Sequence, residues 1–427
     1  MWVIIIYTTI LACTFLATLK YPSTALAALL CLYGLKQWAQ SVNTFFMLHG
    51  TLTNYLVGGI VITALVVMSV SKKTIFSSYP TVGWLTIALF LYSFVSIQWA
   101  ADSDISYKVW AVEFPYIITV VLLGPLLICS SKSLSESLLA LLPLGTLLVL
   151  FLLFTSNWTY RGIEIKGAHG QIFQGNPLAI AEMAGYVMSA VTLQNFRGKW
   201  RSWQVLRWLV VAACLALAAK SGSRGQFFTM IFATALFLPF SRKVGNPLHF
   251  LMLLAGVGVL AILGDWAFHA FSVTGDIRWK SVNIENDFYG RFNTAARLLN
   301  IWWESPPAIL FGLGNSASFN PRIIGFYPHV VPLEILGEEG LLGFFLFLGI
   351  IILTIKSIVR TFVLARSDIK RRGLIAVLSA IFTIEFILSF KQGSMIGSPF
   401  LFCFIILLGK YELLVVDENK NESIAQT

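Results

Sequence analysis

The stretch that decides the fold covers residues 327–351 and reads YPHVVPLEILGEEGLLGFFLFLGII. It begins around a histidine, His329, and continues into an apolar run long enough to cross a bilayer as a helix. Just before this run, residues 271–334 form the longest polar connection in the chain. We therefore expect a titratable imidazole at a membrane–water boundary, and we interpret the other segments around that junction.

The composition excludes a soluble globular protein. Of the 427 residues, 57% are hydrophobic and only 12% are charged, and the mean hydropathy is +0.79. We predict an all-α polytopic membrane protein with about 12–13 transmembrane helices, forming a single integral-membrane domain over residues 1–427. The apolar segments fall at about 2–19, 23–38, 51–70, 81–99, 112–129, 136–154, 177–194, 205–219, 226–240, 248–270, 335–355, 373–390 and 395–411. The second and the last are short enough to be re-entrant.

The positive charges indicate which side of the membrane the connections face. The net charge is +10, but no soluble segment is large enough to carry a basic face, so we expect no nucleic-acid partner. The densest basic clusters, at 197–207 and 356–372, lie on the cytoplasmic side if the connection 271–334 is periplasmic. The five cysteines lie in or at the edge of apolar segments without a C-x-x-C pair, so we predict neither a metal site nor a disulfide frame.

A short polar sequence, AKSGSRGQ at 219–226, follows the eighth apolar segment. Gly222 and Gly225 relax the backbone around Arg224, so amide donors and a guanidinium converge on an anion. Lys220 is a possible supporting cation. The alternative is that these basic side chains extend to the membrane interface.

The connection 271–334 contains a predicted amphipathic helix at Asp287–Glu304. Its apolar side is formed by Phe288, Phe292, Ala295, Leu298, Leu299 and Trp302. Arg291 falls in the middle of that side, where an unpaired charge is costly. It either extends to lipid headgroups or points into the protein toward an anionic ligand. Two prolines stop the helix, and Gly312 and Gly314 then predict a flexible turn.

His329 lies just before the start of the next predicted helix. Pro332 suits the first helical turn, and Glu334 suits the N-terminal end of a helix. The positive end of the helix favours a neutral imidazole, which is able to remove a proton from a hydroxyl. The alternative is an interfacial histidine with a satisfied hydrogen bond. Arg322 adds positive field nearby, and Gly337, Gly340 and Gly343 permit close helix packing.

Taken in order, these motifs resemble the O-antigen ligase superfamily, which includes lipopolysaccharide O-antigen ligases, Wzy-type O-antigen polymerases and protein O-oligosaccharyltransferases. The family motif is a histidine separated by nine residues from G-x-x-G. His329, the residues 331–339, and Gly340 with Gly343 reproduce this spacing. Val330 stands where the family has Asn, Ser or Gln. The resemblance covers roughly residues 155–355.

The resemblance implies an inverting glycosyltransferase that works without a metal or other cofactor in the bacterial inner membrane, with its active site facing the periplasm. The donor is a glycan on undecaprenyl diphosphate, surrounded by membrane lipids. It implies that His329 is the catalytic base and that Arg224 and Arg291 bind the diphosphate. Lys220, Arg322 and Glu334 are possible supporting residues.

Three functions remain open at this level. With lipid A-core as the acceptor the protein is an O-antigen ligase, which we place first. With a second carrier-linked glycan as the acceptor it is a Wzy-type polymerase of O-antigen or exopolysaccharide. From another class, it is a polysaccharide-related transporter or flippase, in which Glu182 and Glu385 couple to ions.

Overall fold

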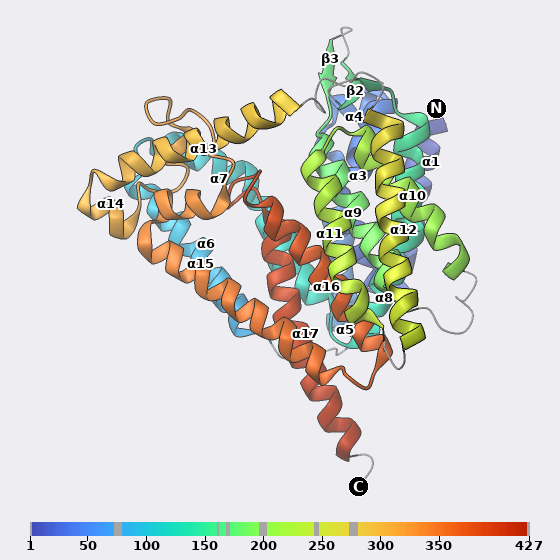
Figure 1. The fold of residues 1–427 in the computed structure, drawn as a ribbon. Coiled ribbons are helices and arrows are strands. Elements are labelled where there is room, and N and C mark those ends of the chain that lie inside the picture. The colour runs from blue at the N-terminus through green and yellow to red at the C-terminus, as the bar shows by residue number, and fades with distance from the viewer. Residues whose placement is uncertain are drawn as a thin grey trace. The chain divides into compact units, whose positions relative to one another are not determined.

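A computed structural model of the chain describes residues 2–71, 79–159, 162–167, 171–195, 203–242, 247–272 and 281–424. The chain is mainly helical (Figure 1), and seven of the described helices are long and apolar enough to cross a membrane. These helical segments are Trp2–Lys20, Leu52–Val70, Thr81–Trp99, Ser103–Leu127, Ser131–Thr155, Val331–Leu364 and Pro399–Ile424. The fold is that of an α-helical polytopic membrane protein. The larger number of 12–13 spans stays a prediction.

Each predicted apolar segment coincides with helix. The seven candidate spans contain α1 (Trp2–Lys20), α5 (Leu52–Val70), α6 (Thr81–Ser96), α7 (Ser103–Tyr116), α8 (Ser131–Thr155), α15 (Val331–Leu364) and α17 (Pro399–Ile424). The other segments are α9 (Pro177–Leu193), α10 (Trp203–Lys220), α11 (Arg224–Ser241), α12 (Pro247–Ser272) and α16 (Ile369–Leu388). The short second segment is divided at Cys31 into α2 (Thr24–Leu30) and α3 (Leu32–Val42), and α4 (Thr44–Leu48) follows it.

By their internal contacts, the residues form two compact units. Unit 1 comprises Met1–Ser77, Leu126–Lys280 and Leu364–Ile384, and unit 2 comprises Ser78–Pro125, Ser281–Val363 and Glu385–Thr427. Lys220 and Arg224 belong to unit 1, whereas Arg291, Arg322, His329 and Glu334 belong to unit 2. The predicted single integral-membrane domain stays a prediction.

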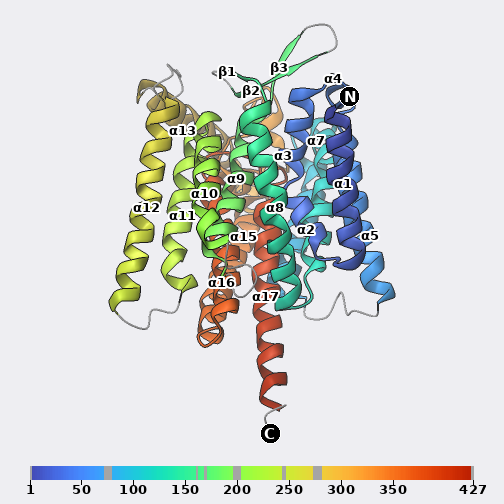
Figure 2. The ribbon, with the colours of Figure 1, turned by 90° about the vertical axis from the view of Figure 1, so that its right-hand side faces the viewer.

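Unit 1 is built around α9, which packs against α8, α10 and α11. Figures 1 and 2 show α9 to α12 running side by side. Almost every residue of α9 is buried, because the helix is apolar on all sides and rich in small residues. Gly145 of α8 allows a close approach to α9, since a Cβ there would lie 2.3 Å from Cγ2 of Val187.

A small antiparallel sheet in unit 1 adds to the predicted α-helical fold. It is formed by β1 (Trp158–Thr159), β2 (Gly162–Lys166) and β3 (Ile172–Gln174), in the order β1-β2-β3. Ile163 and Ile165 are buried and alternate with the more exposed Glu164 and Lys166, which is the period of a strand with one covered face. The connection 156–176 between α8 and α9 therefore contains a sheet.

In unit 2, α13 (Ser281–Trp303) confirms the helix predicted at Asp287–Glu304. Ala295 and Leu298 of its apolar side are buried, and Leu298 packs with Ala317, Ile323 and Ile324. Phe292 differs from the prediction, because its side chain is 54% exposed. After α13 come α14 (Pro306–Phe311) and the short helix η6 (Ala317–Phe319). Of the predicted connection 271–334, residues 273–280 lie outside the described chain.

The helix α15 begins at Val331 with Pro332 in its first turn, as predicted. It is not continuous, however, because Gly340 has φ 67° and ψ −168°. That conformation is essentially restricted to glycine. Of the glycines expected to permit close packing, Gly337 faces Leu298 of α13 and Gly340 faces the backbone of Gly312 and Leu310. The prediction of close packing is confirmed, but the prediction of an uninterrupted helix is wrong at Gly340.

Candidate functional site

His329 adopts a strained backbone conformation. Its φ is 63°, and among the described residues Ser316 is the other non-glycine residue with positive φ. Side chains with a Cβ rarely adopt this left-handed region, and such residues cluster at functional sites. A contact two residues later stabilises this conformation, because the N–H of Val331 donates to the carbonyl oxygen of Ser389 at 2.8 Å. The ring of Tyr327 packs edge-on against the imidazole, with 4.3 Å between ring centroids.

The surroundings of His329 favour the neutral imidazole. Burial lowers the pKa of His329 from its ordinary value of 6.5, and the positive charge of Arg291 lowers it further. The imidazole is therefore unprotonated at neutral pH and able to accept a proton. Burial also raises the pKa of Tyr327, so its phenol stays protonated.

Arg291 points into unit 2. Its Nη1 donates to the carbonyl oxygen of Lys391 at 2.8 Å, and the residue is half-buried. The alternative, in which Arg291 extends to lipid headgroups, stays a prediction. The fork of a guanidinium has five N–H donors, and one bond to a carbonyl leaves others for a second acceptor. That this acceptor is an anionic ligand stays a prediction.

The turn after α14 is packed, not flexible as predicted. The N–H groups of Leu313 and Gly314 donate to the carbonyl oxygens of Gly337 and Glu338, at 3.0 and 2.9 Å. At Gly312, where φ is 80°, a Cβ would lie 2.0 Å from the carbonyl oxygen of Glu338. Gly312 is required because the turn lies directly against the backbone of α15, and Gly314 is required because a Cβ there would lie 2.5 Å from Cα of Ala100.

Two buried carboxylates support this turn, and the sequence interpretation missed them. Glu338 accepts from the N–H groups of Ser316 at 2.7 Å and Ser318 at 2.9 Å. Glu339 accepts from Nδ2 of Asn315 at 3.0 Å. Each carboxylate is 1% exposed. The available signal was the pair of consecutive carboxylates inside an apolar run, which is rare unless both are bonded.

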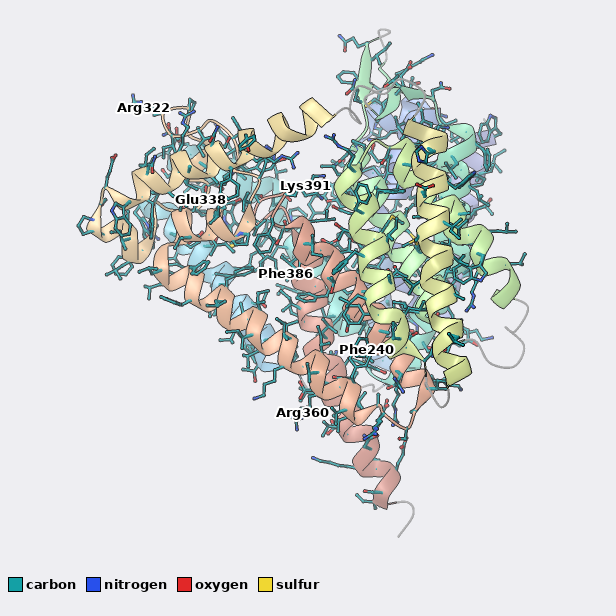
Figure 3. The ribbon with its side chains drawn as sticks, in the orientation of Figure 1. Phe240, Arg322, Glu338, Arg360, Phe386 and Lys391 are labelled. Carbon is teal, nitrogen blue, oxygen red and sulfur yellow. The ribbon has the colours of Figure 1, made fainter. Side chains whose placement is uncertain are left out.

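The possible supporting residues of unit 2 have different positions. Glu334 is 2% exposed, and its Oε1 accepts from the N–H of Met395 at 3.0 Å. It therefore binds the connection between α16 and α17. Arg322 is exposed, and no described contact joins its side chain to His329 or Arg291. Figure 3 shows Arg322 on the other side of α13 from Glu338 and Lys391.

In unit 1, the polar sequence at 219–226 forms a tight bend between α10 and α11. Gly222 has φ 69°, whereas Gly225 lies within α11. Arg224 is half-buried and is the first residue of α11, and its N–H donates to the carbonyl oxygen of Gly222 at 3.2 Å. Nζ of Lys220 donates to the carbonyl oxygen of Leu153 at 3.1 Å and lies 5.5 Å from the ring centre of Trp158. Arg224 thus has the predicted helix-end setting, and Lys220 is engaged with α8.

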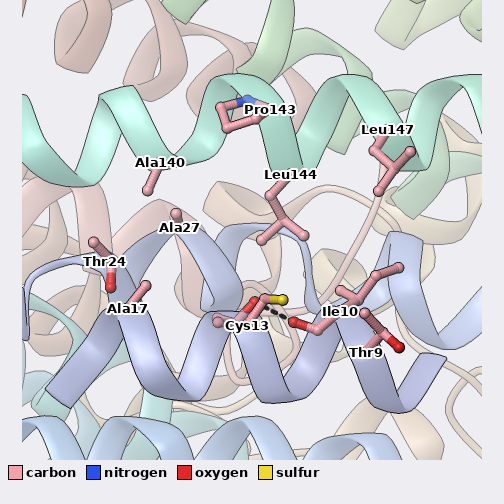
Figure 4. Close-up of a pocket in the computed structure, with 11 residues that line it drawn as sticks. Thr9, Ile10, Cys13, Ala17, Thr24, Ala27, Ala140, Pro143, Leu144 and Leu147 are labelled. Carbon is pink, nitrogen blue, oxygen red and sulfur yellow. Dashed lines mark hydrogen bonds between the residues drawn. The ribbon is translucent and has the colours of Figure 1, made fainter. Parts of the chain in front are cut away.

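An apolar hollow of about 350 Å³ lies among α1, α2 and α8 of unit 1 (Figure 4). Its lining includes Cys13, Ala27 and Leu144, and none of the predicted site residues. The hydroxyls of Thr9 and Thr14 donate to carbonyl oxygens of their own helix, so they are directed away from a ligand. Such a lining suits a hydrocarbon chain and does not suit a polar substrate.

The structure therefore brings Arg291, His329 and the backbone of Lys391 together in unit 2, and it places Lys220 and Arg224 at one helix junction in unit 1. In comparisons with known proteins, no family model matches the chain, and no curated protein is a significant match.

Proposed function

We propose that this protein is a membrane glycosyltransferase that moves a glycan from undecaprenyl diphosphate to an acceptor hydroxyl at the periplasmic face. The acceptor that we place first is lipid A-core, which makes the protein an O-antigen ligase. The geometry around His329 supports this function best, because it combines a proton acceptor, His329, with the guanidinium of Arg291 in one unit.

The single observation that carries the proposal is the strained backbone of His329 next to Arg291. A strained residue persists only where the surrounding contacts hold it, and Val331 and Tyr327 supply such contacts. Burial and Arg291 both lower the pKa of His329. A neutral imidazole is the form required of a general base near neutral pH.

The proposed reaction needs one proton transfer and one displacement. His329 accepts the proton of the acceptor hydroxyl, and the oxygen attacks C1 of the donor sugar from the face opposite the diphosphate. The bond between C1 and the diphosphate oxygen breaks as the new C1–O bond forms, so the configuration at C1 is inverted. Undecaprenyl diphosphate leaves with the electron pair, and Arg224 and Arg291 stabilise its developing negative charge.

A polymerase is the second candidate, since it uses the same donor and the same proton transfer with a carrier-linked glycan as acceptor. Deleting the gene distinguishes the two. A strain that lacks a ligase retains long polymer on the lipid carrier, whereas a strain that lacks a polymerase adds only single repeat units to its acceptor.

Purified full-length protein in lipid vesicles tests the transferase itself. Vesicles are loaded with a labelled carrier-linked oligosaccharide and an acceptor, and both glycan transfer and flux across the bilayer are measured. We expect transfer without flux, and loss of transfer in His329→Ala. Flux that survives His329→Ala, without transfer in the wild type, would show a transporter instead.

A further inference from the structure

The helix α13 carries an apolar stripe that is largely exposed. At about 100° per residue, Ala296, Leu299 and Trp303 recur along one line of the helix, and Phe292 lies on the same line. The side chain of Trp303 is 69% exposed, and Ala296 is exposed as well. Apolar side chains gathered on one line are unfavourable in water, so the stripe indicates a further partner of this helix.

Around its axis, α13 has three different sides. The first is buried, with Ala295 and Leu298 in the core of unit 2. The third is polar and exposed, with Asn293, Asn300 and Glu304. The apolar stripe is the second side, and it lies between the other two. A helix in contact with only protein and water needs one apolar and one polar side, so an additional apolar side indicates lipid.

The exposed apolar surface continues on α14, the helix that follows α13. The side chains of Leu310 and Phe311 are both exposed there. The hydroxyl of Tyr92 in α6 donates to the carbonyl oxygen of Phe311 at 2.9 Å. The ring of Tyr92 also packs against Trp99, the last residue of this candidate membrane span, with 6.2 Å between ring centroids. The exposed side chains of α14 therefore lie next to the end of a span.

A second span begins beside the same turn. The turn after α14 donates two backbone hydrogen bonds to carbonyl oxygens of α15. Further along α15, Leu342 and Phe345 are exposed, as expected of a span whose outer side faces acyl chains. Figure 1 shows α13 and α14 at the end of unit 2 where α15 begins. The spans α6 and α15 thus place α14 at the boundary of the membrane.

We propose that Trp303 of α13 and Leu310 and Phe311 of α14 insert into a lipid bilayer, at the boundary between headgroups and acyl chains, while the polar side of α13 faces water. Tryptophan suits this boundary because its ring is apolar and its Nε1–H group is polar. Arg291 lies on the buried side of the same helix, so this placement also keeps its guanidinium near the depth of the headgroups. The inference does not rest on the proposed reaction.

Quenching of tryptophan fluorescence by brominated phosphatidylcholine tests the inference in the full-length protein. Trp303→Phe removes the exposed ring and Trp302→Phe removes its buried neighbour, so the two variants form a matched pair. The emission of each tryptophan is the difference between the wild type and its variant. It is measured in vesicles with and without bromine near the headgroup end of the acyl chains. We expect bromine to lower the emission of Trp303 severalfold and that of Trp302 much less.

Iodide on both sides of the bilayer identifies what covers the stripe if lipid does not. If iodide quenches Trp303 and brominated lipid does not, the stripe lies in water and the inference is wrong. If neither quencher reaches Trp303, a second copy of the chain or another protein covers it. The inference is wrong in that case also.

A second measurement needs no variant. Wild-type protein in vesicles is photolabelled with a phosphatidylcholine that carries a diazirine in its acyl chain, and the adducts are located by mass spectrometry. We expect adducts at Trp303, Leu310 or Phe311, and at the exposed Phe345 of α15 as the positive control. Adducts at Phe345 without any at the other three positions would overturn the inference even if Trp303→Phe does not fold. Equal labelling of Trp303 and Asn300 would also contradict it, because α13 would then have no lipid-facing side.

Discussion

Arg291 and Arg224 are predicted to bind the same diphosphate, but their surroundings differ. Arg291 lies within a helix, is bonded to a backbone carbonyl one hundred residues later in the chain, and lowers the pKa of a strained histidine. Arg224 is the first residue of α11, directly after a bend at Gly222. One arginine is positioned by tertiary contacts and the other by the local backbone. Two arginines with the same proposed role can therefore be positioned differently, one at the end of a span and the other on the apolar face of a helix.

The largest effect is expected at His329, since the surroundings of Arg291 contain a proposed base and those of Arg224 do not. His329→Ala should lower the rate of glycan transfer by roughly 10²- to 10⁴-fold, the usual contribution of a general base. Tyr327→Phe, which keeps the ring packed against position 329, is the matched control and should retain most of the activity. Rates are measured with purified protein and a carrier-linked donor. Similar rates in His329→Ala and the wild type would remove the base from the account.

The next largest effect is a loss of stability when Gly340 of α15, in the same unit as Arg291, is replaced. Gly340→Ala places a Cβ 2.4 Å from the backbone nitrogen of Gly312 and forces a conformation that side chains avoid. The strain alone costs about 1–3 kcal/mol, and the clash adds to it. Gly349→Ala is the control, because nothing lies within 4 Å of a Cβ there. Thermal unfolding should show a large loss for Gly340→Ala and little change for Gly349→Ala. Equal stability of the two variants would contradict the close packing of this turn.

The surroundings of Arg224 were more predictable from the sequence than those of Arg291. Local composition predicted a relaxed backbone around Arg224 and an apolar segment at 226–240, and the structure has a bend at Gly222 and a helix that starts at Arg224. Arg291 on the apolar side of α13 was also predictable from helical periodicity, as was its inward direction as one of two alternatives. Its partner at Lys391 was not, since no local pattern pairs a residue with a loop one hundred positions later.

The same limit explains the remaining differences. Gly340 belongs to a regular glycine spacing, so the sequence predicted helix packing there and not a break in the helix. The break occurs because the turn at Gly312 lies against that backbone, which is a tertiary contact. Glu338 and Glu339 were overlooked for a related reason, because their partners are backbone N–H groups and an amide in a turn that looked flexible.

Replacing Arg224 and Arg291 separately compares their contributions to transfer and to stability. Arg224→Ala and Arg291→Ala should each lower transfer by roughly 10- to 100-fold, since each loses hydrogen bonds between charged groups. Arg291→Ala should also lower the melting temperature, because the carbonyl of Lys391 loses its donor. Arg322→Ala, exposed in the same unit, is the control for both readings. If Arg291→Ala leaves the melting temperature unchanged, the bond to Lys391 contributes nothing to the fold.

The smallest effect is a shift in the pH profile. Since the pKa of His329 lies below 6.5, the active neutral form dominates at pH 7, and transfer should decline only as the pH falls below 6.5. Arg291→Gln removes a positive charge that lowers this pKa, so the acid limb should move to higher pH. Arg322→Gln should leave the limb in place. The transfer rates of the wild type and of the two variants are measured between pH 5 and pH 8. A shift of the acid limb to lower pH in Arg291→Gln would contradict the predicted direction.

The most direct test of the central claim uses a deletion strain complemented with Arg224→Ala, Arg291→Ala or His329→Ala, each produced at the level of the wild type. The claim is that these three side chains act in one transfer of a carrier-linked glycan. The polysaccharide banding pattern is measured on a gel. We expect the wild-type gene to restore the long bands and none of the three variants to do so. Full restoration by all three variants would contradict the account.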